Sequence, residues 1–513
     1  MENLKTYTLE SGEVLYYTGN PEFSMLERLV AGPGHLWHSG LDQGCKNLMQ
    51  EIIYQSNVMF WYVNDFLAEN QSVSWRCHPH AFVVRKSTWD FVGGFDLDFM
   101  SPTAQALDFA FQLLRFYGGV PLYVKGLFPA TETAVPAIAV TDRYRFFLKS
   151  FKPAHAYYML FRKGIYSLSE WSGLIQAKKN TRKRVYNRTI PVRKLTDTIP
   201  STTVSYIIPT MMRQELVLKL LDDINVQTVL PTEVIIVDAT PDSDLEKVYF
   251  PSKYRFHLRF YKQTSKGSCR ARNEAIEASK GEYIVFGDDD IRIPPDYIEN
   301  HLKFLITYGV NACNGLDTRC QTVTDGLDYL ATRLNAMQDR RWFAGVTSSF
   351  NNANSCIKAS LVKKIGGNDV NFDGGYGEDS DFGHTLAELG EVILSNPFST
   401  TLHLRPESGG YRWWGNQAKI LGKKRKAQPW ELGVPLGFIR PVPSPTIMYG
   451  ILKHFSSQQL NDYKYKHYLH FLQNGSKWFL PARILYLPYK ELQFHKSLFY
   501  AKRLVKASQK KME

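Results

Sequence analysis

The sequence lacks paired cysteines, zinc-type spacing and any apolar run long enough to span a bilayer. Its six cysteines are scattered over 513 residues without a CxxC pair, which argues against a zinc site or a disulfide framework and fits a reducing cytosol. No run of about eighteen apolar residues occurs, so we expect no transmembrane helix. The opening residues, MENLKTYTLESGEV, have no apolar signal core, so we expect a cytoplasmic rather than a secreted protein.

Acidic residues are the minority charge. Lys and Arg outnumber Asp and Glu by 62 to 49, which gives a net charge of +13. A basic protein attracts polyanions such as nucleic acid, an anionic membrane surface or phosphorylated substrates. Because no zinc spacing, helix-turn-helix signature or RNA-recognition aromatic motif is present, we expect no nucleic-acid partner.

A chain of 513 residues is too long for one core and predicts two to four domains. Residues 1–130 alternate short strand-like and helix-like segments, and residues 131–200 predict a helical connector that becomes basic. Residues 201–410 predict an α/β domain, and residues 411–513 predict a basic, aromatic, helical extension. The basic run of the connector is a solvated linker or a site for anionic lipid headgroups. Its members are Lys178, Lys179, Arg182, Lys183, Arg184, Arg188, Arg193 and Lys194.

The most informative stretch is 281–295, GEYIVFGDDDIRIPP. Residues 283–286 form an apolar run that predicts a buried strand, and Asp288, Asp289 and Asp290 follow at its carboxyl end. Ligands of open α/β sheets bind at that end of the strands. Carboxylates buried there need a cation, and their hard oxygens suit Mg²⁺ or Mn²⁺. The alternative for such a cluster is a solvated turn or helix cap.

The segments before this stretch predict a parallel sheet. Residues 204–208 predict a strand that ends in Pro209 and Thr210, residues 216–224 show helical spacing, and residues 233–238 predict a second strand. A strand, a helix and a strand in succession form a βαβ unit, whose strands are parallel. A further helix is predicted at 268–279.

Two distant segments resemble each other. Residues 362–369, VKKIGGND, are similar to residues 89–96, WDFVGGFD, and a helix and a strand are predicted after each. Glu378 and Asp379 in the later segment stand where the earlier one has Gln105 and Ala106. We interpret residues 1–130 as a partial, carboxylate-poor copy of the later domain's C-terminal half, and we expect it to be non-catalytic.

Residues 203–410 resemble family 2 glycosyltransferases with the glycosyltransferase A fold. Four motifs stand in the family's order: VSYIIPT at 204–210, Val237-Asp238, ARN at 271–273 followed by Asp288–Asp290, and GGYGED at 374–379. The resemblance implies a Rossmann-like nucleotide-diphospho-sugar transferase fold, with a mixed, mainly parallel sheet flanked by helices. The N-terminal α/β half-copy and the helical C-terminal extension would be additions to it.

The resemblance also implies a donor site. Asp290 would bind the metal, Mn²⁺ or Mg²⁺, with Asp288 near it and with His403 as a further ligand or else a structural histidine. The residues implied for the nucleotide sugar are Pro209, Thr210, Arg213, Asp238, Arg272, Asp288 and Asp289. Many relatives carry two adjacent acids where this chain has Asp238-Ala239, so a UDP-sugar is favoured as donor only by family habit.

The catalytic base implied by the resemblance is Asp379, with Glu378 beside it. Removing a proton from an acceptor hydroxyl suits a carboxylate at the cleft. A single carboxylate base that faces the leaving group across the sugar implies inversion of configuration, whereas a retaining glycosidase uses a second carboxylate as nucleophile. The alternative for Glu378 and Asp379 is an acid pair that merely complements a helix N-terminus.

The predicted activity is therefore inverting, metal-dependent transfer of a sugar to a glycan or lipid-linked glycan, in surface-polysaccharide synthesis. The chain would act in the cytoplasm, with peripheral attachment to the inner membrane face as an alternative. Trp413 and Trp414 are a candidate sugar platform or core residues, and Lys423–Lys426 form a basic cluster. A nucleotidyltransferase would need a glycine-rich loop where PTMMR stands at 209–213. A non-catalytic glycan- or nucleic-acid-binding protein on the same scaffold stays open.

One amphipathic stripe is predicted near the C-terminus. Phe494, Leu498, Ala501 and Val505 fall on one helical face. Packing of this face on the protein body is preferred over a position in a membrane interface.

Overall fold

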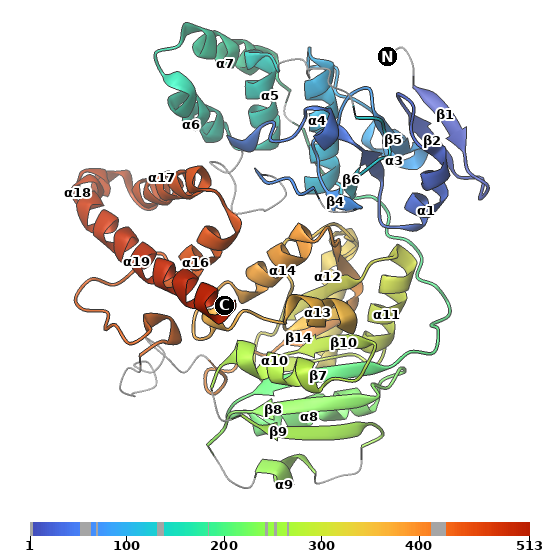
Figure 1. Ribbon diagram of the computed structural model, residues 1–513, viewed down its shortest axis with the longest axis vertical. Helices are drawn as coiled ribbons and strands as arrows, with labels where there is room; N and C mark the ends of the chain where they lie inside the picture. Colours follow the sequence, from blue (N-terminus) through green and yellow to red (C-terminus); the bar gives the residue numbers. More distant parts are fainter. Residues whose placement is uncertain are drawn as a thin grey trace.

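The computed structural model describes residues 4–51, 63–67, 70–130, 138–182, 184–241, 245–250, 254–263, 266–411 and 427–512. It contains two β-sheets, each flanked by helices, and two helical segments, α5–α7 and α16–α19, which lie beside them (Figure 1). Trp413, Trp414 and the cluster Lys423–Lys426 lie outside the described residues.

The larger sheet has eight strands in the order β11-β14-β12-β13-β10-β7-β8-β9. Four neighbours, β10, β7, β8 and β9, are parallel, and β13 runs antiparallel to both β10 and β12. The strands are β7 (Val204–Thr210), β8 (Glu233–Asp238), β9 (His257–Lys262), β10 (Tyr283–Gly287), β11 (Ile291–Arg292), β12 (Ala312–Arg319), β13 (Asn354–Lys358) and β14 (Ile393–His403). The predicted mixed, mainly parallel α/β fold is confirmed.

Helices cover both faces of this sheet because the strand residues alternate in direction. Ile207 packs in one core cluster with residues of α10, α13 and α14, whereas Tyr206 and Ile208 pack in another with α8 and α11. The helices are α8 (Gln214–Asn225), α9 (Leu245–Tyr249), α10 (Ser268–Ala278), α11 (Tyr297–Tyr308), α12 (Leu327–Met337), α13 (Ala359–Ile365) and α14 (Glu378–Glu388). Helices α10 and α14, which carry predicted site residues, therefore share one face.

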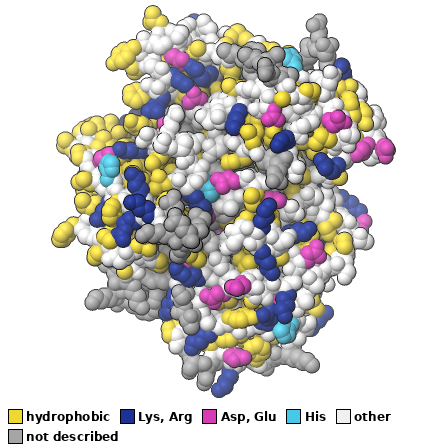
Figure 2. Space-filling model, viewed as in Figure 1, with side chains coloured by type: hydrophobic (Ala, Val, Ile, Leu, Met, Phe, Trp, Pro, Cys, Tyr) yellow, Lys and Arg dark blue, Asp and Glu magenta, His cyan; other side chains and the backbone are white. Residues whose placement is uncertain are grey.

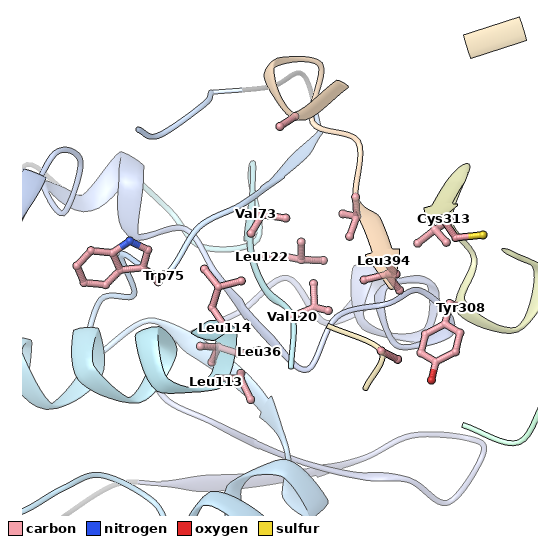
Figure 3. Packing of buried hydrophobic residues seen from close by; sticks show 14 of the residues in the cluster. Leu36, Val73, Trp75, Leu113, Leu114, Val120, Leu122, Tyr308, Cys313 and Leu394 are labelled. Carbon is pink, nitrogen blue, oxygen red and sulfur yellow. The ribbon is translucent and has the colours of Figure 1, made fainter. Parts of the chain in front are cut away.

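The smaller sheet has six strands in the order β1-β2-β5-β3-β6-β4. Its elements are β1 (Lys5–Thr8), β2 (Val14–Tyr17), α1 (Leu26–Ala31), β3 (Leu36–His38), β4 (Gln71–Val73), β5 (Phe82–Arg85), α3 (Lys86–Val92), α4 (Pro102–Arg115) and β6 (Pro121–Val124). Its core joins that of the larger sheet: Figure 3 shows Val73 and Leu122 in the same cluster as Cys313 and Leu394.

The two similar segments have the same local topology. In the first, β3 pairs antiparallel with β5 and parallel with β6, and in the second β12 pairs in the same way with β13 and β14. Helices α3 and α13 begin and end 273 positions apart. Each is followed by two glycines with positive φ, a conformation that favours glycine. This shared topology supports our proposal that the first segment is a partial copy of the second.

One cation links the same two acids in each segment. Asp96 and Asp108 are both paired with Arg184, whose Nη2 lies 2.7 Å from Asp108 Oδ2. Their counterparts 273 positions later, Asp369 and Asp381, are both paired with Lys453, at 3.2 and 2.9 Å. In each case the chain that follows the segment contributes the cation.

Replacing Arg184 with Met should lower the free energy of unfolding by about 3–5 kcal/mol, because Asp108 would be left as a buried charge without its cation. Burial already raises the pKa of Asp108, and Arg184 opposes that rise. Urea unfolding measures the change. The matched control is Lys194→Met, since Lys194 and its partner Asp197 are both exposed. Equal stability of the two variants would show that the buried pair contributes nothing net.

The predicted connector is helical only in its first half. Helices α5 (Val140–Ser150), α6 (Pro153–Gly164) and α7 (Leu168–Asn180) end at Asn180, and the described residues from 184 to 203 contain no helix. The prediction of helix up to 200 is wrong there because Pro191 and Pro200 each lack a backbone donor.

The basic run is not one solvated face. Besides the pairing of Arg184, Arg193 Nη2 donates to the Gly32 carbonyl at 2.8 Å. Arg188 lies over the Phe91 ring at 4.4 Å. Arg184, Arg188 and Arg193 are therefore engaged within the protein, and the lipid-headgroup interpretation is wrong for these three residues. Lys183 lies outside the described residues.

The C-terminal extension contains α16 (Pro445–His454), α17 (Ser457–Gln473), α18 (Leu480–Leu485) and α19 (Leu487–Met512). Phe494 and Ala501 of α19 are buried in a cluster with Trp430 and Tyr449, and Leu498 and Val505 pack against it. The predicted packing of this face on the body is confirmed, so the face itself is not exposed to a membrane. Among the described residues, no helix has both the length and the apolar character needed to cross a bilayer.

Candidate active site

The carboxyl ends of β7 and β10 bring the first predicted residues together. Thr210 Oγ1 donates to Asp289 Oδ2 at 2.8 Å. The two strands approach closely, since a Cβ on Gly287 would lie 2.2 Å from the hydroxyl oxygen of Tyr206. Pro209 is buried inside β7, beside Val237 of β8. The structure thus places Thr210 at the site and Pro209 in the strand beneath it.

Asp289 and Asp290 share one arginine. Arg213 Nη1 lies 2.8 Å from Asp289 Oδ1 and 3.0 Å from Asp290 Oδ2. The segment after β14 closes over this arginine, because the Ser408 carbonyl accepts from Arg213 Nε at 3.2 Å. Burial raises the pKa of Asp289 to about 6, the charges of its neighbouring aspartates raise it too, and Arg213 opposes the rise. Asp289 therefore faces Thr210 and Arg213.

Asp288, Asp290 and His403 form a candidate metal site. Each offers a ligand atom, and these atoms all lie within 4.8 Å of one another. His403 Nε2 lies 3.2 Å from Asp290 Oδ1, and its Nδ1 lies 3.3 Å from Asp317 Oδ2. Burial alone would lower the pKa of His403, but the hydrogen bonds to these two carboxylates raise it to about 10. Two carboxylates and an imidazole, with a third carboxylate (Asp317) hydrogen-bonded to that imidazole, are a donor set that fits Mn²⁺ or Mg²⁺.

Arg272 of α10 lies between the two groups of acids. Its Nη2 donates to Asp288 Oδ1 at 2.6 Å, and the side chain is buried. Its Nε and Nη1 are buried and have no hydrogen-bond partner among the described residues. Leaving such donors unpaired costs free energy. Two unpaired donors on a buried guanidinium indicate that an anionic ligand belongs here.

Asp379 and Glu378 open helix α14, as the sequence predicted, and follow Gly377, which has a φ of 112°. Asn352 donates to Asp379 Oδ1 from its side-chain nitrogen at 2.7 Å and from its backbone at 3.2 Å. Burial raises the pKa of Asp379, and Arg272 and Asn352 oppose this rise. For Glu378, burial and then the charge of Asp379 raise the pKa to about 7, against the effect of Arg272. A carboxylate made more basic by burial suits a general base.

Asp238 was predicted to bind the nucleotide sugar, and that role stays a prediction. It is fully buried at the end of β8. Its oxygens accept from Thr240, from Gln214 Nε2 at 3.2 Å and from the Tyr249 hydroxyl at 2.7 Å. This network holds the loop after β8 and leaves Asp238 outside the Asp288–Asp290–His403 cluster.

Sequence reasoning missed three supporting residues: Asp317, Asn352 and Asp373. Asp373 Oδ1 accepts from the Cys269 backbone at 2.7 Å and its Oδ2 pairs with Arg270 at 2.9 Å, which joins the start of α10 to the loop before α14. Gly267 leaves room for it, since a Cβ there would lie 2.2 Å from Asp373 Oδ2. The position of Asp317 near the end of a strand could have marked it as a candidate site residue. No feature of the sequence marks Asn352 in this way.

Comparison with known proteins gives a family match for part of the chain. The family model for glycosyl transferase family 2 matches residues 205–365. An uncharacterized glycosyltransferase of Haemophilus influenzae is 32% identical over 129 residues, which are 25% of this chain and 42% of that protein. Glycosyltransferase GlyA of Streptococcus pneumoniae is 27% identical over 113 residues, 22% of this chain and 16% of that protein. The chain thus spans less than half the length of these relatives.

Two solved structures show limited similarity to this chain. A mannosyltransferase of Pyrobaculum calidifontis, in complex with GDP-Man and Mn²⁺, is 19% identical over 60% of this chain and 89% of that chain, with a TM-score of 0.34. Residues 1–349 of TarS from S. aureus, in complex with UDP-GlcNAc, are 14% identical over 60% of this chain and 92% of that chain, with a TM-score of 0.37. The family match alone identifies residues 205–365, from β7 to α13, as a glycosyl transferase family 2 domain.

Proposed function

We propose that the chain is an inverting, metal-dependent glycosyltransferase that moves a sugar from a nucleoside-diphosphate donor to a hydroxyl of a glycan or lipid-linked glycan. A role in surface-polysaccharide synthesis and a UDP-sugar as the donor belong to the same proposal. The observation that carries it is Arg272, which is buried between Asp288 and the Glu378–Asp379 pair with two donors unpaired. A diphosphate would supply the missing acceptors.

The donor side combines a cation site with the guanidinium. Asp288, Asp290 and His403 would hold Mn²⁺ or Mg²⁺, and a bound divalent ion offsets the charge that develops on a departing diphosphate. Nε and Nη1 of Arg272 would donate to the phosphate oxygens, since a planar fork of donors matches that geometry. Arg213 keeps Asp289 and Asp290 in place.

The acceptor side depends on Asp379. Its raised pKa makes it a better proton acceptor than an exposed carboxylate, and Asn352 fixes the orientation of its carboxyl group. A hydroxyl deprotonated by Asp379 would attack the anomeric carbon from the side opposite the diphosphate. One displacement of this kind inverts the configuration, as it does in inverting glycosidases.

We propose that the N-terminal partial copy has no catalytic role. Gln105 and Ala106 occupy the positions that correspond to Glu378 and Asp379, so no proton acceptor stands at the start of α4. Asp108, which corresponds to Asp381, is buried against Arg184 and Gln112.

Chelation of divalent ions should abolish donor hydrolysis and weaken donor binding at least tenfold. The experiment measures calorimetric binding and hydrolysis of uridine, guanosine and thymidine diphosphate sugars, with Mn²⁺ or Mg²⁺ and then with EDTA. Asp290→Asn should reduce hydrolysis about 100-fold or more, because a metal ion supplies several kcal/mol of charge stabilisation. It should also weaken Mn²⁺ binding measured by electron paramagnetic resonance.

Asp328→Asn is the matched control, because Asp328 is exposed on α12 and is not part of the cluster. Its donor and Mn²⁺ binding should match those of the parent protein. Failure of the folded protein to bind any donor in the presence of metal would contradict the proposal. A non-catalytic glycan- or nucleic-acid-binding role would then be tested by glycan binding and by gel shift at moderate salt.

A further inference from the structure

A run of exposed apolar side chains lies at the turn between α17 and α19. Trp478 is 91% exposed, Phe479 67% and Leu485 82%, and Ile484 and Tyr486 are exposed too. We call these five residues the apolar tip; they belong to the short helix Lys477–Phe479, to α18 and to the residue after it. Soluble proteins seldom expose contiguous patches of this kind without a partner.

The apolar tip belongs to a segment that packs firmly elsewhere. The opposite side of α19 is buried, with Phe494, Tyr500 and Ala501 in a cluster that includes residues of α16. Leu492 and Phe499 lie on the exposed side of the same helix. The segment therefore has its own packed core, and the exposed residues lie outside that core.

Basic residues far outnumber acidic ones in the segment that carries this surface. Residues 463–512 contain eleven Lys and Arg residues and one acidic residue, Glu491, so this segment carries +10 of the chain's net +13. Figure 2 shows Lys and Arg side chains among the hydrophobic ones on the left of the molecule, where Figure 1 places α18 and α19. Lys477 and Arg483 are themselves members of the short helix and of α18.

A second exposed apolar turn lies at the neighbouring helices α6 and α7. Tyr166 and Leu168, at this turn, are 96% and 86% exposed. The contact between the two segments is made by Arg162 of α6, whose Nη2 lies 2.9 Å from Asp462 Oδ1 of α17 and whose guanidinium stacks over Tyr465. Two helical segments in contact with each other thus each expose apolar side chains at a turn.

We propose that the apolar tip, with the basic residues of α18 and α19, docks on an anionic lipid bilayer. Trp, Tyr and Phe favour the boundary between headgroups and acyl chains, and Lys and Arg attract anionic headgroups. A second copy of the chain does not fit a symmetric contact here, because the same positive surface would face itself. Nucleic acid does not fit either, since its phosphates offer nothing to Leu485 and Ile484.

Co-sedimentation of the full-length protein with vesicles tests this docking, without any sugar donor. The protein should bind vesicles of 70% phosphatidylcholine and 30% phosphatidylglycerol at low salt, and it should bind pure phosphatidylcholine at least tenfold more weakly. The double variant Trp478→Ser, Leu485→Ser should lose at least tenfold in affinity for the anionic vesicles, because two exposed apolar side chains no longer enter the interface. Lys477→Gln with Arg483→Gln should weaken binding and reduce its salt dependence.

The matched control is Val226→Ser, because Val226 is also exposed but lies at the end of α8. It should bind like the parent protein, and circular dichroism should show that all variants are folded. The proposal is overturned by equal binding to neutral and anionic vesicles, by no binding to either, or by binding that the double variant retains. It is also overturned if light scattering shows a dimer that the double variant dissociates.

Discussion

Asp379→Asn should reduce sugar transfer about 1,000-fold while donor binding stays within a factor of about two, as expected when a general base is removed. Asparagine keeps the oxygen that accepts from Asn352, so the start of α14 should keep its geometry. What is lost is the ability to take a proton from the acceptor hydroxyl. Initial rates of transfer and donor calorimetry measure the two quantities separately.

Three variants make this result specific. Ser380→Ala changes an exposed residue of the same helical turn and should leave the rate unchanged. Asp108→Asn, at the position that corresponds to Asp381 in the partial copy, should lower stability through Arg184 but leave the turnover of the folded protein intact. If Glu378→Gln lost as much rate as Asp379→Asn without unfolding, or Asp379→Asn kept its rate, the assignment of the base would be wrong.

The pH profile gives an independent check on the same residue. Because burial raises the pKa of Asp379, its active, ionised form is lost as the pH falls through that raised value. The rate of the parent protein should therefore fall on the acid side at a higher pH than for an exposed aspartate. The residual rate of Asp379→Asn should lack this acid limb.

The strand-and-aspartate core of the site was predictable because its signals are local in the sequence. An apolar run followed at once by Asp288–Asp290 identifies both the strand and its functional end, and the βαβ pattern from 204 to 238 identifies its neighbours. The edge strand β9 was missed because its sequence, HLRFYK, is largely polar and only partly buried. Local pattern reading succeeds where burial is continuous and fails at the edge of the sheet.

The supporting contacts were not predictable because they join residues far apart in the chain. Asp317 reaches His403 across the β12–β14 pair, and Asn352 reaches Asp379 from the loop before β13. Neither residue belongs to a motif. Asp238 was identified from its place in a motif, but its hydrogen bonds with Thr240, Gln214 and Tyr249 could not be predicted from the sequence.

Arg272→Met should lower kcat/KM for sugar transfer about 100- to 1,000-fold and weaken donor binding, because the donors that would contact the diphosphate are removed. It should also shift the acid limb of the pH profile. The Arg272 charge lowers the pKa of both Glu378 and Asp379, so its removal raises those values and moves the limb to higher pH.

Arg272→Lys separates the two effects, since lysine keeps a positive charge but loses the planar fork. Its acid limb should stay near that of the parent protein, while most of the loss in kcat/KM should remain. Arg270→Met is the control on the same helix, because Arg270 pairs with Asp373 and not with Asp288; its effect should be several-fold smaller. If Arg272→Lys kept full activity, Arg272 would act through the effect of its charge on Glu378 and Asp379. The proposal that its two unpaired donors contact a diphosphate would then be wrong.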